Sequence, residues 1–347
     1  MIFITRYICC LFMVLSIMIG GVKAPNIGSN ANVSLQPTAN LAGGGNNILG
    51  FGVMLNGFNF ASSTTTCTFA GFFPVSSTVS LNGGTLSLAE DFICFQPVAF
   101  PTGGTILGNQ SLFAIGETTT DFALTATFNF DSTMLRFDTN TRLYSTLQFA
   151  QGCKICGKHG KVLTLNNGSA LVVRPNSQLI IEDITIRNVG RTNLRCLMDN
   201  GSIVLRNVIL ESSANYTFSR GSILFDQDVI FTGTTTFAYT TGVGSTINSL
   251  STLMFDHDTT LSYAPRRANG SLLSMTDQTS CLYLSGCTLF STYTGLQLQT
   301  GTLLLDDQVT VTSTSRNSGE ALLLNSSLTT KVMGGASVYM YGRIKYQ

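Results

Sequence analysis

LLLDDQVTV, residues 303–311, consists of two short alternating segments separated by a polar turn. Apolar residues occupy the first and third positions of each segment, and the residues DDQ stand between the segments. In a β-strand, alternate side chains point to opposite faces, so this pattern predicts two strands that each bury one face. The same nine-residue pattern, with small departures, recurs at residues 86–94, 223–231, 253–261 and 282–290.

The copies recur at the spacing of a solenoid repeat. Versions one residue shorter occupy 179–186 and 203–210, and weaker matches begin at Leu135 and Leu163. From residue 179 onward the copies start at positions 179, 203, 223, 253, 282 and 303. Such units predict one coil each, and coils stacked about 4.8 Å apart satisfy one another's backbone hydrogen bonds. We therefore expect an all-β chain that forms a parallel β-helix of about a dozen irregular coils. β-sandwich domains are the structural alternative, because the intervals are irregular.

This pattern resembles the right-handed parallel β-helix proteins of the pectin-lyase-like group, which includes polysaccharide lyases, adhesin passengers and phage tailspikes. The resemblance covers residues 80–340 and lies in the repeat rather than in a diagnostic motif. It implies a solenoid of the adhesin or passenger type.

The composition indicates an exported protein with an uncharged polar surface. Hydrophobic residues make up 44% of the chain and charged residues only 11%, with 19 basic and 18 acidic side chains. Nucleic acids and anionic membranes are bound through an excess of basic residues, so we expect neither as a partner.

The N-terminus resembles a signal peptide over residues 1–24. Arg6 precedes an apolar run at 7–19, and residues 20–24, GGVKA, resemble a small-residue cleavage site. Pro25 directly after Ala24 disfavours cleavage there, so cleavage after Gly20 or Gly21 and an uncleaved anchor stay open. We expect a secreted or surface-displayed chain without a membrane span once the leader is removed.

Composition also suggests two further segments. Residues 25–60 are rich in Gly and Asn, which predicts a flexible arm or an N-terminal cap. We expect residues 61–347 to form a single β-solenoid domain.

Acidic residues recur in the turns of the repeat. Asp226, Asp256 and Asp306 occupy the first turn position of their copies. If adjacent coils brought Asp226 and Asp256 together, the carboxylates would repel, bind a proton or share a cation such as Ca²⁺. The alternative is that Asp favours turns because it bonds nearby backbone amides.

Asp306 and Asp307 are the candidate catalytic pair, because glycosidases use paired carboxylates. Polygalacturonases of the same fold group carry an Asp-Asp motif, and fragments at 158–160 and 343–345 look similar to two others of their motifs. Here the histidine fragment precedes Asp306, and the Asn-Thr-Asp motif does not occur. We therefore expect the protein not to be an enzyme.

Cysteines suggest two other sites. Cys153, Cys156 and His159 have the spacing that begins some zinc sites and redox motifs, with a loop disulfide or core thiols as the alternative. Cys281 and Cys287 are the candidate disulfide pair, in a region beyond the leader that holds an odd number of cysteines.

The last alternating segment predicts an edge that accepts another strand. Val338 and Met340 belong to the alternating segment 337–341 of a final coil that no amphipathic capping helix follows, and they mark this edge. We expect a structural solenoid that acts as an adhesin or as a self-assembling, filament-like subunit. Its partners would be copies of itself, or glycans or proteins of a host or cell surface. A polysaccharide-binding or polysaccharide-degrading protein on the same fold is the alternative, and fold alone does not decide between them.

Overall fold

The computed structural model describes most of the chain beyond its first 32 residues. The described residues are 33–35, 39–41, 46–50, 53–55, 58–70, 73–75, 78–94, 98–116, 120–266, 272–292, 295–314 and 320–346. The predicted leader, 1–24, lies outside them. Among the described residues no helix is long and apolar enough to cross a membrane.

The chain forms two compact units, one of residues 1–148 with 152–154 and the other of residues 149–151 with 155–347. Within the described residues every element is a β-strand, and the strands form about 11 turns of stacked coils. The strand pairings are parallel in both units. The predicted parallel solenoid is therefore confirmed, and the β-sandwich alternative is wrong.

Unit 1 holds the early coils, with strands of three to five residues and one of two. Five of them lie in the segment 25–60, predicted as an arm or a cap. Its strands are β1 (Val33–Leu35), β2 (Ala39–Leu41), β3 (Asn46–Gly50), β4 (Val53–Leu55), β5 (Phe58–Phe60), β6 (Thr66–Ala70), β7 (Phe73–Val75), β8 (Val79–Ser80), β9 (Thr85–Leu88), β10 (Phe92–Cys94), β11 (Gly104–Leu107), β12 (Leu112–Ile115), β13 (Phe122–Leu124), β14 (Phe128–Asp131), β15 (Met134–Phe137) and β16 (Thr141–Leu143). The limit between the units falls within β17 (Thr146–Phe149) and β18 (Cys153–Gly157).

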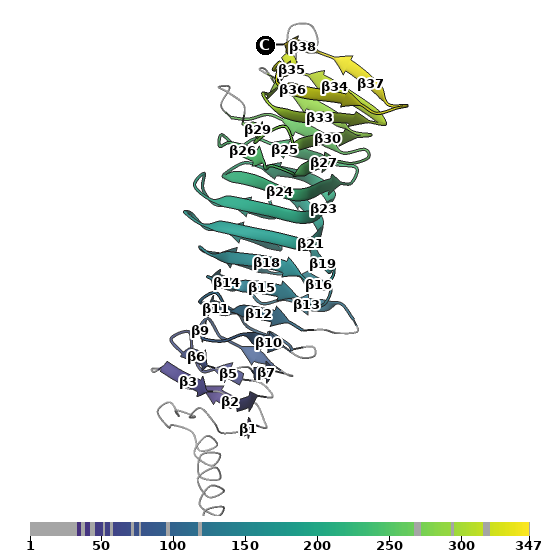
Figure 1. Cartoon of the computed structure of the whole chain (residues 1–347). Helices are drawn as coiled ribbons and strands as arrows, with labels where there is room; N and C mark the ends of the chain where they lie inside the picture. The colour runs from purple at the N-terminus through teal and green to yellow at the C-terminus, as the bar shows by residue number, and fades with distance from the viewer. Residues whose placement is uncertain are drawn as a thin grey trace, which may run out of the picture. The chain divides into compact units, whose positions relative to one another are not determined.

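Unit 2 contains the later coils, including three long strands that bend around a corner of the coil. Its strands are β19 (Val162–Leu165), β20 (Ala170–Val173), β21 (Gln178–Arg191), β22 (Leu194–Cys196), β23 (Ser202–Phe218), β24 (Ser222–Thr232), β25 (Thr236–Tyr239), β26 (Ser245–Ile247), β27 (Thr252–Phe255), β28 (Thr260–Tyr263), β29 (Leu273–Met275), β30 (Cys281–Ser285), β31 (Thr288–Ser291), β32 (Leu296–Leu298), β33 (Gly301–Asp306), β34 (Gln308–Ser313), β35 (Glu320–Leu324), β36 (Leu328–Val332), β37 (Ser337–Tyr341) and β38 (Arg343–Tyr346). Figure 1 shows β21, β23 and β24 as neighbouring long strands.

Each coil of unit 2 has three faces. The first face consists of the early parts of β21, β23 and β24, followed by β26, β29, β32, β35 and β38. The second face consists of the later parts of β21, β23 and β24, followed by β27, β30, β33 and β36. The third face includes the end of β23 and then β25, β28, β31, β34 and β37.

The core of unit 2 consists of the inward residues of these strands, as the alternation predicts. In β27, Leu253 and Phe255 are buried, whereas Thr252 and Met254 are half-buried. Rings stack from coil to coil: the centroids of Phe231 and Phe255 are 5.1 Å apart and their planes differ by 11°. The stacking places like residues above one another, because parallel strands in register repeat each inward position.

The copies of the nine-residue pattern do not all occupy the same two faces. The copies that start at 179, 203 and 223 run from the first face to the second. The copies that start at 253, 282 and 303 run from the second face to the third. The pattern moves on by one face between the copies that start at 223 and 253. The second segment of the first copy, 229–231, pairs with the first segment of the next copy, 253–255. The 30 residues between starts 223 and 253 thus span one coil and one additional face.

Candidate functional site

Three stacked turns of unit 2 form a polar corner between its second and third faces. The turns are 256–258, 285–287 and 306–308, and we call them the acidic corner. Leu284 lies in register between Phe255 and Leu305, which places these turns one above another. The backbone continues the ladder through the corner, because Asp258 N–H donates to Gly286 O (2.8 Å) and Gly286 N–H donates to Asp306 O (3.1 Å).

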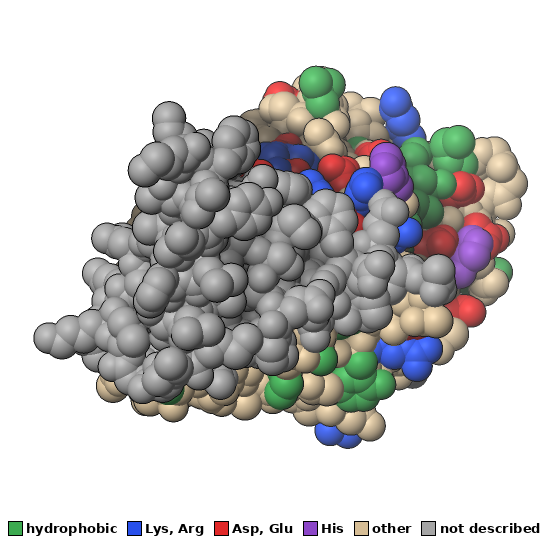
Figure 2. Space-filling view, turned by 90° about the horizontal axis from the view of Figure 1, so that it is seen from below, with side chains coloured by type: hydrophobic (Ala, Val, Ile, Leu, Met, Phe, Trp, Pro, Cys, Tyr) green, Lys and Arg blue, Asp and Glu red, His purple; other side chains and the backbone are tan. Residues whose placement is uncertain are grey.

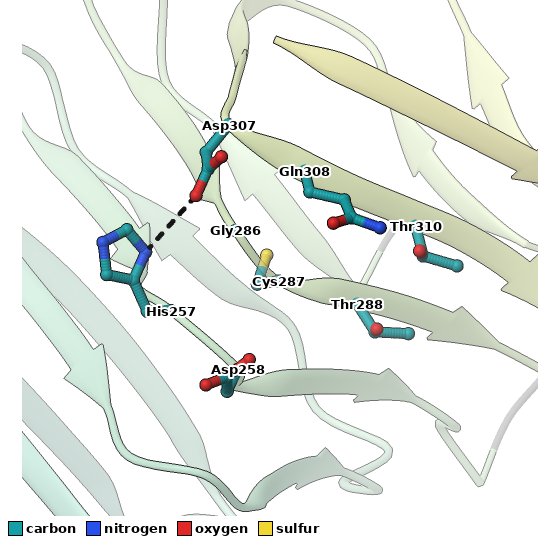
Figure 3. A pocket seen from close by; sticks show the side chains of 8 residues that line it. All are labelled: His257, Asp258, Gly286, Cys287, Thr288, Asp307, Gln308 and Thr310. Atoms are coloured by element: carbon teal, nitrogen blue, oxygen red, sulfur yellow. Dashed lines mark ion pairs between the residues drawn. The ribbon is translucent and has the colours of Figure 1, made fainter.

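A histidine lies between two carboxylates at this corner. His257 Nδ1 is 3.4 Å from Asp256 Oδ1 in its own turn and 4.0 Å from Asp307 Oδ2, two turns away. Gly286 occupies the turn between them: a Cβ there would lie 2.8 Å from His257 Nδ1 and 3.1 Å from Asp307 Oδ2. The missing side chain thus leaves the space across which His257 and Asp307 face each other (Figure 3).

The carboxylate of Asp306, next to Asp307 in the chain, makes other contacts. Asp306 Oδ2 accepts a hydrogen bond from the Tyr283 hydroxyl (2.7 Å), and Asp306 Oδ1 accepts one from the Asp307 backbone N–H (2.9 Å). The bond to Asp306 is the main cause that raises the pKa of Tyr283. Asp306 and Asp307, the candidate catalytic pair, are therefore adjacent but have different partners. Asp306 accepts hydrogen bonds from Tyr283 and from the backbone of its own turn, whereas Asp307 faces the imidazole of His257.

The acidic corner borders a shallow depression of about 490 Å³, lined by His257, Asp258, Gly286, Cys287, Thr288, Asp307, Gln308 and Thr310. His257 and Asp307 are about two-thirds exposed, at 66% and 64% of their side-chain surface. Figure 2 likewise shows histidine side chains at the surface, near acidic and basic ones. Carboxylate, amide and hydroxyl groups in such a depression can exchange hydrogen bonds with a polar ligand.

Cys287 contributes a buried thiol at the floor of this corner. Burial raises its pKa from 9.0 to about 12, so the nucleophilic thiolate is scarce at neutral pH despite the nearby imidazole. The arrangement therefore does not make a cysteine–histidine catalytic pair.

Asp226 and Asp256 lie at different corners of the coil, so stacking does not bring these two carboxylates together. Asp226 lies between the first and second faces, where Arg206 Nε donates to its Oδ2 (2.9 Å) and Asn248 Nδ2 to its Oδ1 (3.2 Å). Arg206 also bridges to Glu182 on the preceding coil (3.2 Å). The shift of the pattern by one face between 223 and 253 separates the two aspartates.

Cys153, Cys156 and His159 do not converge. Along β18, Cys153 is buried and Cys156 is half-buried, because a separation of three residues in a strand puts side chains on opposite sides. His159 follows in an exposed turn, with φ of +53°. Across the described part of the chain, no group of three or more His, Cys, Asp or Glu could hold a metal ion.

Cys281 and Cys287 are both free thiols in the structure, so the predicted disulfide is not formed. Cys281 begins β30 and faces outward, half-exposed, whereas Cys287 is buried beyond the end of that strand. An extended strand separates the two residues, and it holds their sulfur atoms apart.

The predicted assembly edge is exposed. Val338 and Met340 lie in register with the buried Val309 and Val311 and so point inward, yet Met340 is 39% exposed. Among the described residues, β37 has its paired neighbour, β34, on one side only.

Sequence reasoning missed the His257–Asp307 pair. Its two members are 50 residues apart in the chain and meet only because the coil between them has glycine at the intervening position. The sequence signal that could have indicated this pair is His257 flanked by Asp256 and Asp258.

No family model, curated protein or solved structure matches this chain.

Buried thiols predict a loss of stability at high pH. The pKa values of Cys67, Cys196 and Cys287 are raised by burial from 9.0 to about 12. Because the folded protein holds these protons more tightly, the contribution of the three thiols to stability should be constant below pH 9 and fall between pH 9 and 12. The slope would be up to about 1.4 kcal/mol per pH unit for each thiol.

Urea denaturation at pH 8, 9, 10 and 11 measures this slope. The Cys287→Ala variant is the comparison and should lose less stability between pH 9 and 11 than the parent protein. An identical pH slope in the two proteins would show that Cys287 does not contribute.

Proposed function

We propose that this protein is an exported structural β-solenoid that assembles end to end, one copy adding its first described coil, β1–β3, to the exposed coil β36–β38 of another. The observation that carries the proposal is the apolar character of that coil. Of the ten exposed large hydrophobic side chains among the described residues, six lie between 332 and 346: Val332, Met333, Tyr339, Met340, Tyr341 and Tyr346.

The backbone of the exposed coil supports strand addition. β36, β37 and β38 pair with β33, β34 and β35, and the described residues show no other strand register for these three strands. Unpaired N–H and C=O groups on a strand edge are a template for another strand. The exposed coil thus offers three edges in parallel orientation.

The opposite end of the described chain offers a matching number of strands. β1, β2 and β3 form the first described coil, and they pair in parallel with β4, β5 and β6. A parallel coil that adds to β36–β38 in the same direction continues the existing ladder. Head-to-tail contacts of this kind are heterologous and produce open filaments when the rotation does not close.

The low charge and the signal-like N-terminus support an extracellular place for such an assembly. Proteins and glycans of a cell surface would then meet the lateral faces, which suits the adhesin variant of this function.

Met340→Pro should block this growth without unfolding the coil. Ser337 N–H donates to Asp307 O (2.8 Å), and successive amides of a strand point to opposite sides, so the Met340 N–H points to the free edge. Proline removes this donor and leaves the bonds to β34 in place. Negative-stain electron microscopy and light scattering should show filaments for the parent protein and isolated particles for the variant.

Met340→Val is the matched control, since valine keeps the N–H and favours strands. This variant should assemble as the parent does. Filaments of Met340→Pro, or a parent protein that stays as isolated particles at high concentration, would refute end-to-end assembly.

A further inference from the structure

Asn-Gly dipeptides are positions at which an asparagine side chain can react with its own backbone. The nitrogen of the following residue can attack the side-chain amide carbon Cγ, and glycine permits this because it has no side chain to hinder the approach. The attack requires a free backbone N–H, an amide that no other group holds, and room for the ring that forms. The described part of the chain contains three such dipeptides, which begin at Asn82, Asn167 and Asn200.

The dipeptide Asn167–Gly168 meets all three conditions. It lies in the exposed part of the turn 166–169, which joins β19 to β20. Neither the side chain of Asn167 nor the N–H of Gly168 makes a hydrogen bond with any other described residue. Nothing lies within 4 Å of a Cβ built on Gly168, whose φ is +84°. The buried Ser169 holds the turn together, because it donates its N–H (3.0 Å) and its hydroxyl (2.8 Å) to Asn166 O.

The dipeptide Asn82–Gly83 is held at both reacting groups. Asn82 Nδ2 donates to Asn59 Oδ1 (3.0 Å) and to Phe60 O (2.5 Å). The N–H of Gly83 donates to Gly103 O (2.8 Å). Attack on Cγ of Asn82 therefore has to wait until these bonds open.

The dipeptide Asn200–Gly201 is held in the same way. Asn200 Nδ2 donates to Asn176 Oδ1 (2.6 Å), and the N–H of Gly201 donates to Met198 O (3.2 Å). Gly201 is also buried, and a Cβ built on it would lie 3.1 Å from Cys196 Cβ. A ring formed at this position would therefore have little room.

We propose that Asn167 is a self-modifying site, which deamidates in the folded protein with water as the only co-reactant. The Gly168 nitrogen forms a bond to Asn167 Cγ, the Cγ–Nδ2 bond breaks, and the amide nitrogen leaves as ammonia with the proton of the Gly168 N–H. Water then opens the resulting succinimide ring at one of its two carbonyl groups. Opening at the Cγ carbonyl gives aspartate, and opening at the main-chain carbonyl gives isoaspartate.

The products change the turn between β19 and β20 in two ways. Each product adds one carboxylate, and isoaspartate also adds one atom to the main chain. The strands on both sides of the turn are anchored by neighbouring coils, because Leu163 is in register with Ile186 and Leu171 with Leu194. We therefore expect the change to stay within the turn and the coil to stay folded.

Peptide mass spectrometry of the folded full chain, incubated at mildly alkaline pH, follows the three dipeptides in one sample. Asn167 should convert to aspartate and isoaspartate about tenfold faster or more than Asn82 and Asn200, because hydrogen bonds must open first at the other two sites. In guanidinium chloride these bonds are absent, and the three rates should agree within about threefold.

Three results would overturn the proposal. The first is a rate at Asn167 in the folded protein that equals the rates at Asn82 and Asn200. The second is the same tenfold preference for Asn167 after unfolding, which would assign it to the local sequence. The third is conversion to aspartate without isoaspartate, which would mean direct hydrolysis of the amide and no attack by Gly168.

Asn176→Gly is the matched variant, because it frees the amide of Asn200 and leaves Asn167 untouched. Asn176 is exposed and has φ of +55°, so glycine suits its backbone. Asn200 should then convert about threefold faster or more, while Asn167 keeps its rate. An unchanged rate at Asn200 would show that hydrogen bonding of the amide does not govern the reaction, and the assignment of Asn167 would fail with it.

Discussion

Phe255→Ala is expected to lower the free energy of unfolding of unit 2 by about 3–5 kcal/mol, the cost of deleting a fully buried aromatic side chain. Phe255 is 0% exposed and lies against two other rings. Its centroid is 5.1 Å from that of Phe231 and 5.8 Å from that of Phe237. Its removal leaves a cavity in the middle of the stacked core, which flat parallel strands cannot close by a small shift.

Met254→Ala on the same strand is the control for this prediction. Met254 points outward, so its truncation should cost only about 1 kcal/mol or less in the folded monomer. Chemical denaturation followed by circular dichroism, in the Met340→Pro background, compares the two variants. Equal losses would mean that the inward side of β27 does not carry the packing energy.

Gly221→Ala is expected to cost about 3 kcal/mol or more, from backbone strain and a steric clash together. Gly221 has φ of +78°, which residues with a Cβ rarely adopt. A Cβ there would lie 2.5 Å from Gly201 O and 2.7 Å from Cys196 Sγ. Neither neighbour can move easily, because one is backbone and the other is a buried side chain.

Gly335→Ala separates the two causes. Gly335 has φ of +91°, but nothing lies within 4 Å of an added Cβ. Only the strain should remain, about 1 kcal/mol. The difference between the two variants in denaturation midpoints measures the clash at Gly221, and similar midpoints would contradict the close approach of coils there.

The local pattern of the sequence determined the coil. Alternation in 303–311 predicts which side chains point inward, and Leu303, Leu305, Val309 and Val311 are all buried. It also places Asp306 and Asp307 in the polar turn between the two strands, whereas the inward direction of Val338 and Met340 follows from their register with Val309 and Val311. The alternation in 303–311 follows from the two-residue period of a strand, which involves only neighbours along the chain.

Only the tertiary structure decided which coil lies above which. The nine-residue pattern fits any two consecutive faces, so it carries no information about the face on which a copy begins. Segment 229–231 stacks on 253–255, and this shift separates Asp226 from Asp256. The same stacking brings His257 to Asp307 across Gly286. Register between coils depends on contacts between residues more than 20 positions apart and on the turns that connect them, and the alternation of a single strand determines neither.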